Sequence, residues 1–158
     1  MKSVPDFCDE YSDKIQILQI NFKNFGAVDK FCGEIVTVKC PEDNSLLRRL
    51  LGDDGTGKVL VVNGGASNAC AYLGDNLALL AYQNNWAGIL INGMVRDVDE
   101  LAKMRIGIKA LGAHPKKSEK RGLGEFGHDI EFGGVKFQSG AFVYSDNNGV
   151  IVSSSQLL

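Results

Sequence analysis

Three short apolar runs separated by helix-length stretches constrain the fold of this chain more than any other feature. The runs Lys58–Val62, Gly88–Ile91 and Ile106–Leu111 have the character of strands that are buried on both faces of a sheet. A helical pattern fills 68–83, and a shorter helix is expected over 97–104. This alternation predicts parallel strands that are joined by right-handed crossovers.

The flanking segments predict a second part of the fold. A short helix over 5–13, a strand over 15–22, a strand over 31–40 and a helix from Pro41 to Leu51 come before the parallel unit. A polar, Gly-rich stretch over 114–127 is expected to be an exposed loop. Short strands at hairpin spacing then follow at 130–132, 135–137, 141–144 and 150–153. The expected fold class is α/β, with parallel βα units joined to a mainly antiparallel β half in one domain, 1–158.

Composition excludes several classes of function. The net charge of −2 gives no overall basic field, which argues against a dedicated nucleic-acid binder. The apolar runs are too short to cross a membrane, and no secretory signal precedes Pro5, so we expect a cytoplasmic protein. The four cysteines form no CxxC pair, which favours reduced thiols over a zinc site.

Two polar stretches stand out because each follows a predicted strand and opens a predicted helix. The first is Gly74-Asp75-Asn76-Leu77, and the second ends in Arg96-Asp97. Ligands of open α/β structures bind beyond the carboxyl ends of the strands, so the two stretches are expected side by side. Backbone N–H groups at the first stretch favour an anion.

The side chains of the second stretch complement those amides. Arg96 offers a planar fork that suits a carboxylate, and Asp97 is a hard oxygen ligand for Mg²⁺ or Mn²⁺. A metal ion, an arginine and amide donors together suit a small 2-oxo acid whose oxygen gains charge as an enolate. Asp75 is the candidate for orienting a water or moving a proton.

Each of these residues also has a purely structural interpretation. Asp97 and Glu100 form an Asp-x-x-Glu pattern that is typical of a capping box at a helix start. Gly74-Asp75 is equally compatible with a simple helix break and cap. Arg96 is equally compatible with a surface ion pair to Asp99 or Glu100. Spacing alone leaves these alternatives open.

The sequence as a whole resembles the RraA-like family, which includes regulators of ribonuclease E activity and class II aldolases that act on 4-hydroxy-4-methyl-2-oxoglutarate. The resemblance extends from about Val4 to Val152. Its most specific motif is Asp75, then twenty residues, then Arg96-Asp97. Supporting stretches include Thr37-Val38-Lys39, Trp86-Ala87-Gly88 and Tyr144-Ser145-Asp146.

The resemblance implies a swivelling β/β/α fold, a homotrimer and a role for each site residue. Gly74, Asp75, Asn76 and Leu77 would bind the substrate carboxylate, and Arg96 would bind the pyruvate part and offset enolate charge. Asp97 would hold the divalent metal, largely through waters, while Asp75 would support a metal-bound water. The implied activities are aldol cleavage of 4-hydroxy-4-methyl-2-oxoglutarate and decarboxylation of oxaloacetate, both through a metal-stabilised pyruvate enolate.

Two departures point toward the regulator branch of the family. The chain ends at Leu158, before the C-terminal extension that brings a neighbouring subunit's carboxylate in the aldolases, which counts against efficient aldolase activity. The run Asn63–Ser67 also replaces a more usual Asp-Gly-Gly-Gly-Ser. The alternative function is therefore a non-catalytic trimer that binds and inhibits ribonuclease E, with the loop 114–121 as its candidate surface. A GxGxxG nucleotide fingerprint is absent, which argues against a methyltransferase.

Overall fold

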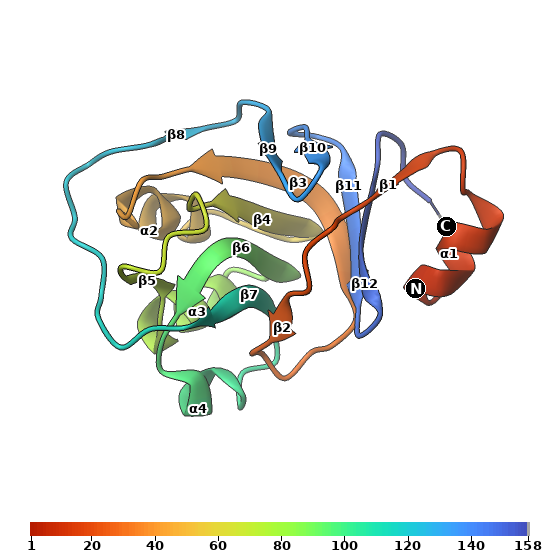
Figure 1. Ribbon diagram of the computed structural model, residues 1–158. Helices are drawn as coiled ribbons and strands as arrows, with labels where there is room; N and C mark the ends of the chain where they lie inside the picture. The colour runs from red at the N-terminus through yellow and green to blue at the C-terminus, as the bar shows by residue number, and fades with distance from the viewer. Residues whose placement is uncertain (158) are drawn as a thin grey trace.

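A mixed β-sheet forms the centre of the molecule, which the computed structural model describes over residues 1–157 (Figure 1). Its strands lie in the order β1-β12-β11-β3-β4-β6-β7-β2, while β5 pairs with β6 and β8 pairs with β3. The first strands of the chain are β1 (Ile15–Ile17), β2 (Lys23–Asn24), β3 (Phe31–Lys39), β4 (Lys58–Asn63), β5 (Ala71–Leu73) and β6 (Gly88–Val95). The later ones are β7 (Gly107–Ala113), β8 (Glu125–Phe126), β9 (Ile130–Phe132), β10 (Val135–Phe137), β11 (Phe142–Asp146) and β12 (Gly149–Ser153).

The sheet has a parallel and an antiparallel part. Strands β3, β4, β6 and β7 run parallel to one another. Strands β11, β12 and β1 continue the sheet antiparallel beyond β3, and β2 pairs antiparallel with β7 at the other edge. The parallel strands are joined through α2 (Ser45–Leu51), α3 (Asp75–Gln83) and α4 (Val98–Leu101). The predicted fold class, parallel βα units with a mainly antiparallel half, is confirmed.

The two faces of the sheet are covered by different elements. Leu47 of α2, Leu77 of α3 and Leu101 of α4 pack in one apolar cluster with the buried side chains of β4 and β6. The opposite face packs against the β9–β10 hairpin, where the Phe132 and Phe137 rings stack with 4.6 Å between their centroids. Burial on both faces explains the continuous apolar runs of β4 and β6.

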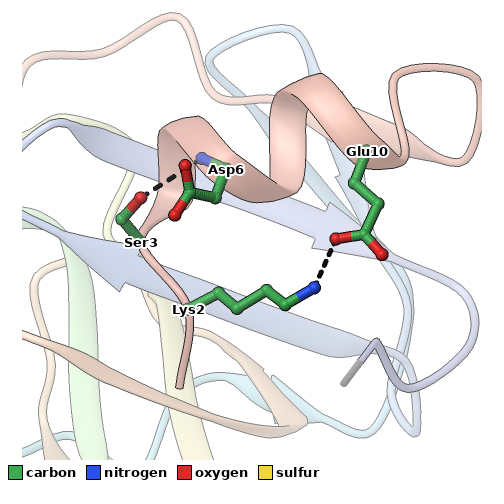
Figure 2. A network of polar contacts seen from close by, with 4 residues as sticks. All are labelled: Lys2, Ser3, Asp6 and Glu10. Atoms are coloured by element: carbon green, nitrogen blue, oxygen red, sulfur yellow. Dashed lines mark hydrogen bonds and ion pairs between the residues drawn. The ribbon is translucent and has the colours of Figure 1, made fainter.

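The N-terminal helix α1 (Val4–Glu10) lies against β11 and β12, beside the end of the chain (Figure 1). Ser3 is its N-cap and accepts a hydrogen bond from the N–H of Asp6 across 3.2 Å (Figure 2). Lys2 pairs with Glu10 along the same helix (Figure 2). The apolar side, with Phe7, packs on Tyr144 of β11.

The prediction of one helix over 68–83 is wrong in its first half. Ala71–Leu73 forms strand β5, which pairs with Met94 and Val95 at the end of β6, and α3 begins only at Asp75. The cause is Tyr72, whose fully buried hydroxyl shares its one hydrogen between the carbonyl oxygens of Cys40 and Gly64 and accepts from the N–H of Glu42. These distant partners hold the segment extended.

Strand β6 is also longer than predicted. It continues through Gly93 to Val95, because β5 and β7 both pair with its last residues. A side chain at position 93 would overlap the Tyr72 ring, so the glycine permits this packing and does not end the strand.

Three other predicted bounds are too long or incomplete. Only Ile15–Ile17 of the 15–22 segment is a strand, and only Val98–Leu101 of the 97–104 segment is an α-helix. Within the predicted loop 114–127, Glu125–Phe126 pairs antiparallel with the end of β3. None of the helices within residues 1–157 has the length and apolar character that a membrane crossing requires.

Candidate active site

A pocket of about 650 Å³ opens where β5 and β6 end and α3 begins. One side is lined by Lys116–Lys120. They belong to residues 114–124, which we call the strap; Figure 1 shows it as the long connection that leaves β7 and reaches β8 at the edge of the molecule. The lining side chains come from α2, β5, α3, the end of β6 and the strap: Asn44, Arg48, Ala71, Tyr72, Leu73, Gly74, Asp75, Asn76, Leu77, Arg96, Asp97, Lys116, Lys117, Ser118, Glu119 and Lys120.

The two polar stretches meet through a hydrogen bond between their acidic residues. The Asp97 carboxylate oxygen Oδ2 accepts from the backbone N–H of Asp75 across 3.0 Å. Asp97 therefore places its charge at the N-terminus of α3, where the helix dipole stabilises an anion. The capping box expected with Glu100 is not formed, because the Asp97 side chain makes no capping hydrogen bond to its own helix.

The backbone conformation of Asp97 explains why its side chain points toward α3. Its φ of 56° and ψ of 42° lie in the left-handed region, which aspartate tolerates better than most residues. In this conformation the carboxylate reaches α3 across the pocket. Such a strained residue costs on the order of 1 kcal/mol and is typical of functional sites.

Gly74 makes the close approach of the Asp97 carboxylate to α3 possible. A Cβ at this position would overlap Asp97 Oδ2 and would lie 3.4 Å from Arg96 Cγ. Gly74 is the N-cap residue of α3, and its extended backbone (φ −129°, ψ −166°) is open to any residue. The glycine is therefore required by space, and the simple helix-break interpretation does not account for its contacts.

Arg96 enters the pocket from the end of β6. Its backbone N–H donates to the carbonyl of Leu73 across 2.9 Å, which ties the two strand ends together. Within residues 1–157 its guanidinium makes no ion pair with Asp99 or Glu100. The carboxylate oxygen Oε1 of Glu100 instead lies 3.9 Å from Nζ of Lys103. The half-buried Arg96 side chain is thus left to the pocket.

Two further donors belong to the first turn of α3. The first intrahelical bond is from the N–H of Ala78 to the carbonyl of Gly74, so the N–H groups of Asn76 and Leu77 have no acceptor within the helix. Both residues line the pocket. A carboxylate at this point would meet backbone N–H groups and the Arg96 guanidinium together.

The strap is fastened to the body of the protein at both ends of its lysine-rich part. The N–H of Ala71 donates to the carbonyl of Lys116 across 2.7 Å. Asp43 Oδ2 accepts from the N–H groups of Arg121 and Leu123 at 2.7 and 3.0 Å. Lys116–Lys120 is therefore held beside the pocket and is not a free loop.

Asp43 is buried, and its hydrogen bonds set its charge state. Burial raises the pKa of its carboxyl, but donors from Ser45, Leu123 and Arg121 outweigh that effect and hold the pKa well below its usual range. Asp43 thus stays ionised and holds the strap.

All six residues that the sequence singled out line this one pocket: Gly74, Asp75, Asn76, Leu77, Arg96 and Asp97. The roles assigned to them stay predictions. Sequence reasoning missed Arg48 and the strap lysines as pocket residues. Nothing local to Arg48 marks it, and the sequence predicts the strap only as an exposed loop and a candidate surface for a protein partner.

One family model covers nearly the whole chain. The family described as RraA-like, Aldolase/RraA, matches residues 4–152. A protein of Pseudomonas fluorescens (strain Pf0-1), provisionally named 4-hydroxy-4-methyl-2-oxoglutarate aldolase, is 52% identical over 153 residues, which cover 97% of this chain and 94% of that protein.

Two solved structures share the fold under different names. A Geobacillus kaustophilus HTA426 protein, described as S-adenosylmethionine:2-dimethylmenaquinone methyltransferase, superposes with a TM-score of 0.97 at 41% identity, covering 99% of this chain and 97% of that one. The RNA-processing inhibitor RraA of Thermus thermophilus gives 0.96 at 38% identity, covering 100% and 96%. The pocket motif, the fold and these matches agree, and the chain belongs to the RraA-like family.

Proposed function

We propose that this protein is a divalent-metal-dependent carbon–carbon lyase. Its substrates would be 4-hydroxy-4-methyl-2-oxoglutarate, which it would cleave to two molecules of pyruvate, and oxaloacetate, which it would decarboxylate. The observation that carries the proposal is the meeting of the Arg96 guanidinium, the Asp97 carboxylate and the first turn of α3 in one pocket. Two relatives that are 52% and 53% identical in sequence carry the name of an aldolase, which supports the same assignment.

The oxygen donors of the pocket fit a largely hydrated Mg²⁺ or Mn²⁺. Within residues 1–157 no group of three or more His, Cys, Asp or Glu side chains is arranged to hold a metal ion. Mg²⁺ often keeps several waters and uses only one or two carboxylates. Asp97 would supply one, through the carboxylate oxygen that Asp75 does not use. When bound, the ion would polarise the 2-oxo group and offset developing negative charge.

The protein groups would position the 2-oxo acid end of the substrate. Arg96 would bind its carboxylate in a charge-assisted pair, and the N–H groups of Asn76 and Leu77 would add two donors. The side chain that leaves as the second product would extend away from this end, into the part of the pocket beside the strap.

Both reactions break the same bond. In the aldol cleavage, the electrons of the C3–C4 bond become the enolate of pyruvate, and the C4 hydroxyl loses its proton to become the second oxo group. In oxaloacetate the same bond breaks and carbon dioxide leaves. Asp75 would take up the hydroxyl proton directly or through a water, and C3 of the enolate would then be protonated.

The test is pyruvate release by the purified protein with Mg²⁺ or Mn²⁺, followed by coupling to lactate dehydrogenase. Wild type should release pyruvate from both substrates above the background given by the free metal ion. Arg96→Ala and Asp97→Ala should lose about a hundredfold or more of this activity. Arg105→Ala and Asp99→Ala are matched controls, because both residues lie next to the site in sequence but do not line the pocket. Turnover no faster than the free ion, or equal loss in the controls, contradicts the proposal.

A second candidate function rests on the 38% identity to the RNA-processing inhibitor of Thermus thermophilus. In this case the protein, as a homotrimer in the cytoplasm, would bind ribonuclease E and slow RNA cleavage. The exposed strap residues Lys116, Lys117 and Lys120 are a candidate contact. Pull-down with ribonuclease E and an RNA cleavage assay test this function, and light scattering tests the trimer. Full RNA cleavage at a saturating excess of the protein contradicts it.

A further inference from the structure

The pocket contains more cationic side chains than the recognition of one carboxylate requires. Its lining includes five cations, Arg48, Arg96, Lys116, Lys117 and Lys120, and three acids, Asp75, Asp97 and Glu119. The protein as a whole carries a net charge of −2, so this excess is local. A concave site with excess positive charge concentrates anionic ligands.

These cations come from different elements: Arg96 from the end of β6, Arg48 from α2, and the lysines from the strap. Arg96 follows β6, which pairs with one edge of β5 through Met94 and Val95. Lys117 bridges to Ala71 at the other edge of β5. The backbones that carry Arg96 and Lys117 are therefore two strand spacings apart, roughly 10 Å. A ligand with two separated carboxylates can therefore meet Arg96 with one end and Lys117 with the other.

Arg48 and the strap lysines have no oppositely charged side chain as a partner within residues 1–157. Over residues 1–157 no ion pair involves Arg48, Lys116, Lys117 or Lys120. Arg48 is an exposed residue of α2 that lines the pocket. The adjacent Arg49 does not line it; its Cζ atom lies 5.3 Å from the centroid of the Phe126 ring. The Arg48 guanidinium is thus available for a ligand.

Ser118 adds an independent observation on this part of the pocket lining. It lies in the middle of the fastened strap segment, is 4% exposed and lines the pocket. Its hydroxyl is buried and has no hydrogen bond partner within residues 1–157, and the same holds for Asn44 Oδ1 beside Arg48. Buried polar atoms are normally paired, so these two, of four unpaired ones within residues 1–157, show that the protein's own groups leave the polar lining incomplete here.

We propose that Arg48 and the strap lysines Lys117 and Lys120 form a second anion subsite, which selects 2-oxo acids that carry another carboxylate two or three carbons away. This inference rests on the proposed function, because it takes Arg96 and the start of α3 to bind the 2-oxo acid end. Arg48 is the specificity-determining residue of the subsite, since its planar fork can pair with a carboxylate through two hydrogen bonds.

The test uses two ligands of equal chain length that differ only at the far end. 2-Oxoglutarate carries a second carboxylate, whereas 2-oxopentanoate carries a methyl group there, and neither has the 4-hydroxyl group that aldol cleavage needs. Isothermal titration calorimetry with Mg²⁺ measures both dissociation constants. Wild type should bind 2-oxoglutarate about tenfold to a hundredfold more tightly than 2-oxopentanoate, the range expected for a charge-assisted pair.

Variants locate the effect. Arg48→Gln should bring the two dissociation constants within about threefold of each other, by weakening only 2-oxoglutarate. The double variant Lys117→Gln/Lys120→Gln should reduce the ratio in the same direction. Arg49→Gln, on the same helix but outside the pocket lining, should keep the wild-type ratio.

The outcomes separate this inference from the proposed function. Equal binding of both ligands by wild type, or a ratio that survives Arg48→Gln and the double lysine variant, overturns the second subsite alone. Binding of neither ligand overturns the second subsite and also counts against the proposed recognition of 2-oxo acids. A ratio that falls in Arg48→Gln but not in Arg49→Gln supports the subsite.

Discussion

Asp97 Oδ2 lies 3.0 Å from the backbone nitrogen of Asp75 and accepts its hydrogen, although 22 residues separate the two in sequence. This contact joins the end of β6 to the first turn of α3. It places a carboxylate, a guanidinium and a helix N-terminus around one point. The chemistry proposed for the pocket depends on that arrangement, and the first two predictions test it.

Asp97→Asn and Asp97→Ala should separate the structural and chemical parts of this contact. The asparagine oxygen still accepts the Asp75 N–H, so thermal stability should stay near wild type. Alanine removes the acceptor, and stability should fall by about 1 kcal/mol, as for a lost helix cap. Activity should be lost in both variants, because neither supplies a charged oxygen for the metal ion. Thermal denaturation and pyruvate release measure the two effects, and full activity in Asp97→Asn contradicts a metal-ligand role.

Gly74→Ala should damage the site more than the fold. The new methyl group would overlap Asp97 Oδ2 and must displace the carboxylate, whereas the backbone at this position accepts alanine without strain. We expect at least a tenfold loss of pyruvate release, with a stability change of about 1 kcal/mol or less. Gly52→Ala is the control, since a methyl group there meets only helix carbonyls at 3.3 Å or more. Wild-type activity in Gly74→Ala means that Asp97 need not lie where the structure places it.

Asp43→Asn should destabilise the protein in a pH-dependent manner. The carboxylate accepts hydrogen bonds from Arg121 and Leu123 of the strap, and its pKa is lowered in the folded state. A lowered pKa contributes stability above the pKa of the unfolded chain, about 4, and this contribution is lost as the pH falls further. Urea unfolding should therefore show a loss of about 1–3 kcal/mol at pH 7 that shrinks by pH 3. An equal loss at both pH values contradicts the assignment.

Tyr72→Phe should weaken the anchor behind the pocket. The Tyr72 hydroxyl contacts the carbonyls of Cys40 and Gly64 and the N–H of Glu42, and burial raises its pKa to about 12. It therefore stays protonated and able to donate throughout the neutral range. Its removal leaves buried backbone groups unpaired, and urea unfolding should show a loss of about 1–3 kcal/mol. A loss below about 0.5 kcal/mol means that these backbone groups find other partners.

The parallel strands and the two polar stretches were predictable from sequence for physical reasons. Strands buried on both faces require continuous apolar runs, and the carboxyl ends of parallel neighbours must meet at one edge. The alternatives for Asp97 and Arg96 were not separable from spacing. The left-handed backbone of Asp97, which turns its side chain toward α3, is not encoded in a local pattern.

The positions of strand β5 and the strap could not be predicted from local sequence. Ala71–Leu73 is too short for a period of two to be distinguished from a helical turn, and its conformation depends on the distant partners of Tyr72. The strap lies beside the pocket because Asp43 binds backbone groups 78 and 80 residues away. Contacts of this range bring Lys117 and Lys120 into the same pocket lining as Arg48, and no local signal predicts them.

The central claim is that this pocket stabilises the enolate of pyruvate, and proton exchange measures it most directly. Pyruvate incubated with the protein and Mg²⁺ in D₂O should exchange its methyl protons for deuterium, because the enolate returns to pyruvate by taking a deuteron from the solvent. Loss of the methyl signal in proton NMR follows the rate. The account predicts exchange well above that of Mg²⁺ alone, abolished in Arg96→Ala and Asp97→Asn and retained in Arg105→Ala. Exchange no faster than with Mg²⁺ alone would contradict it.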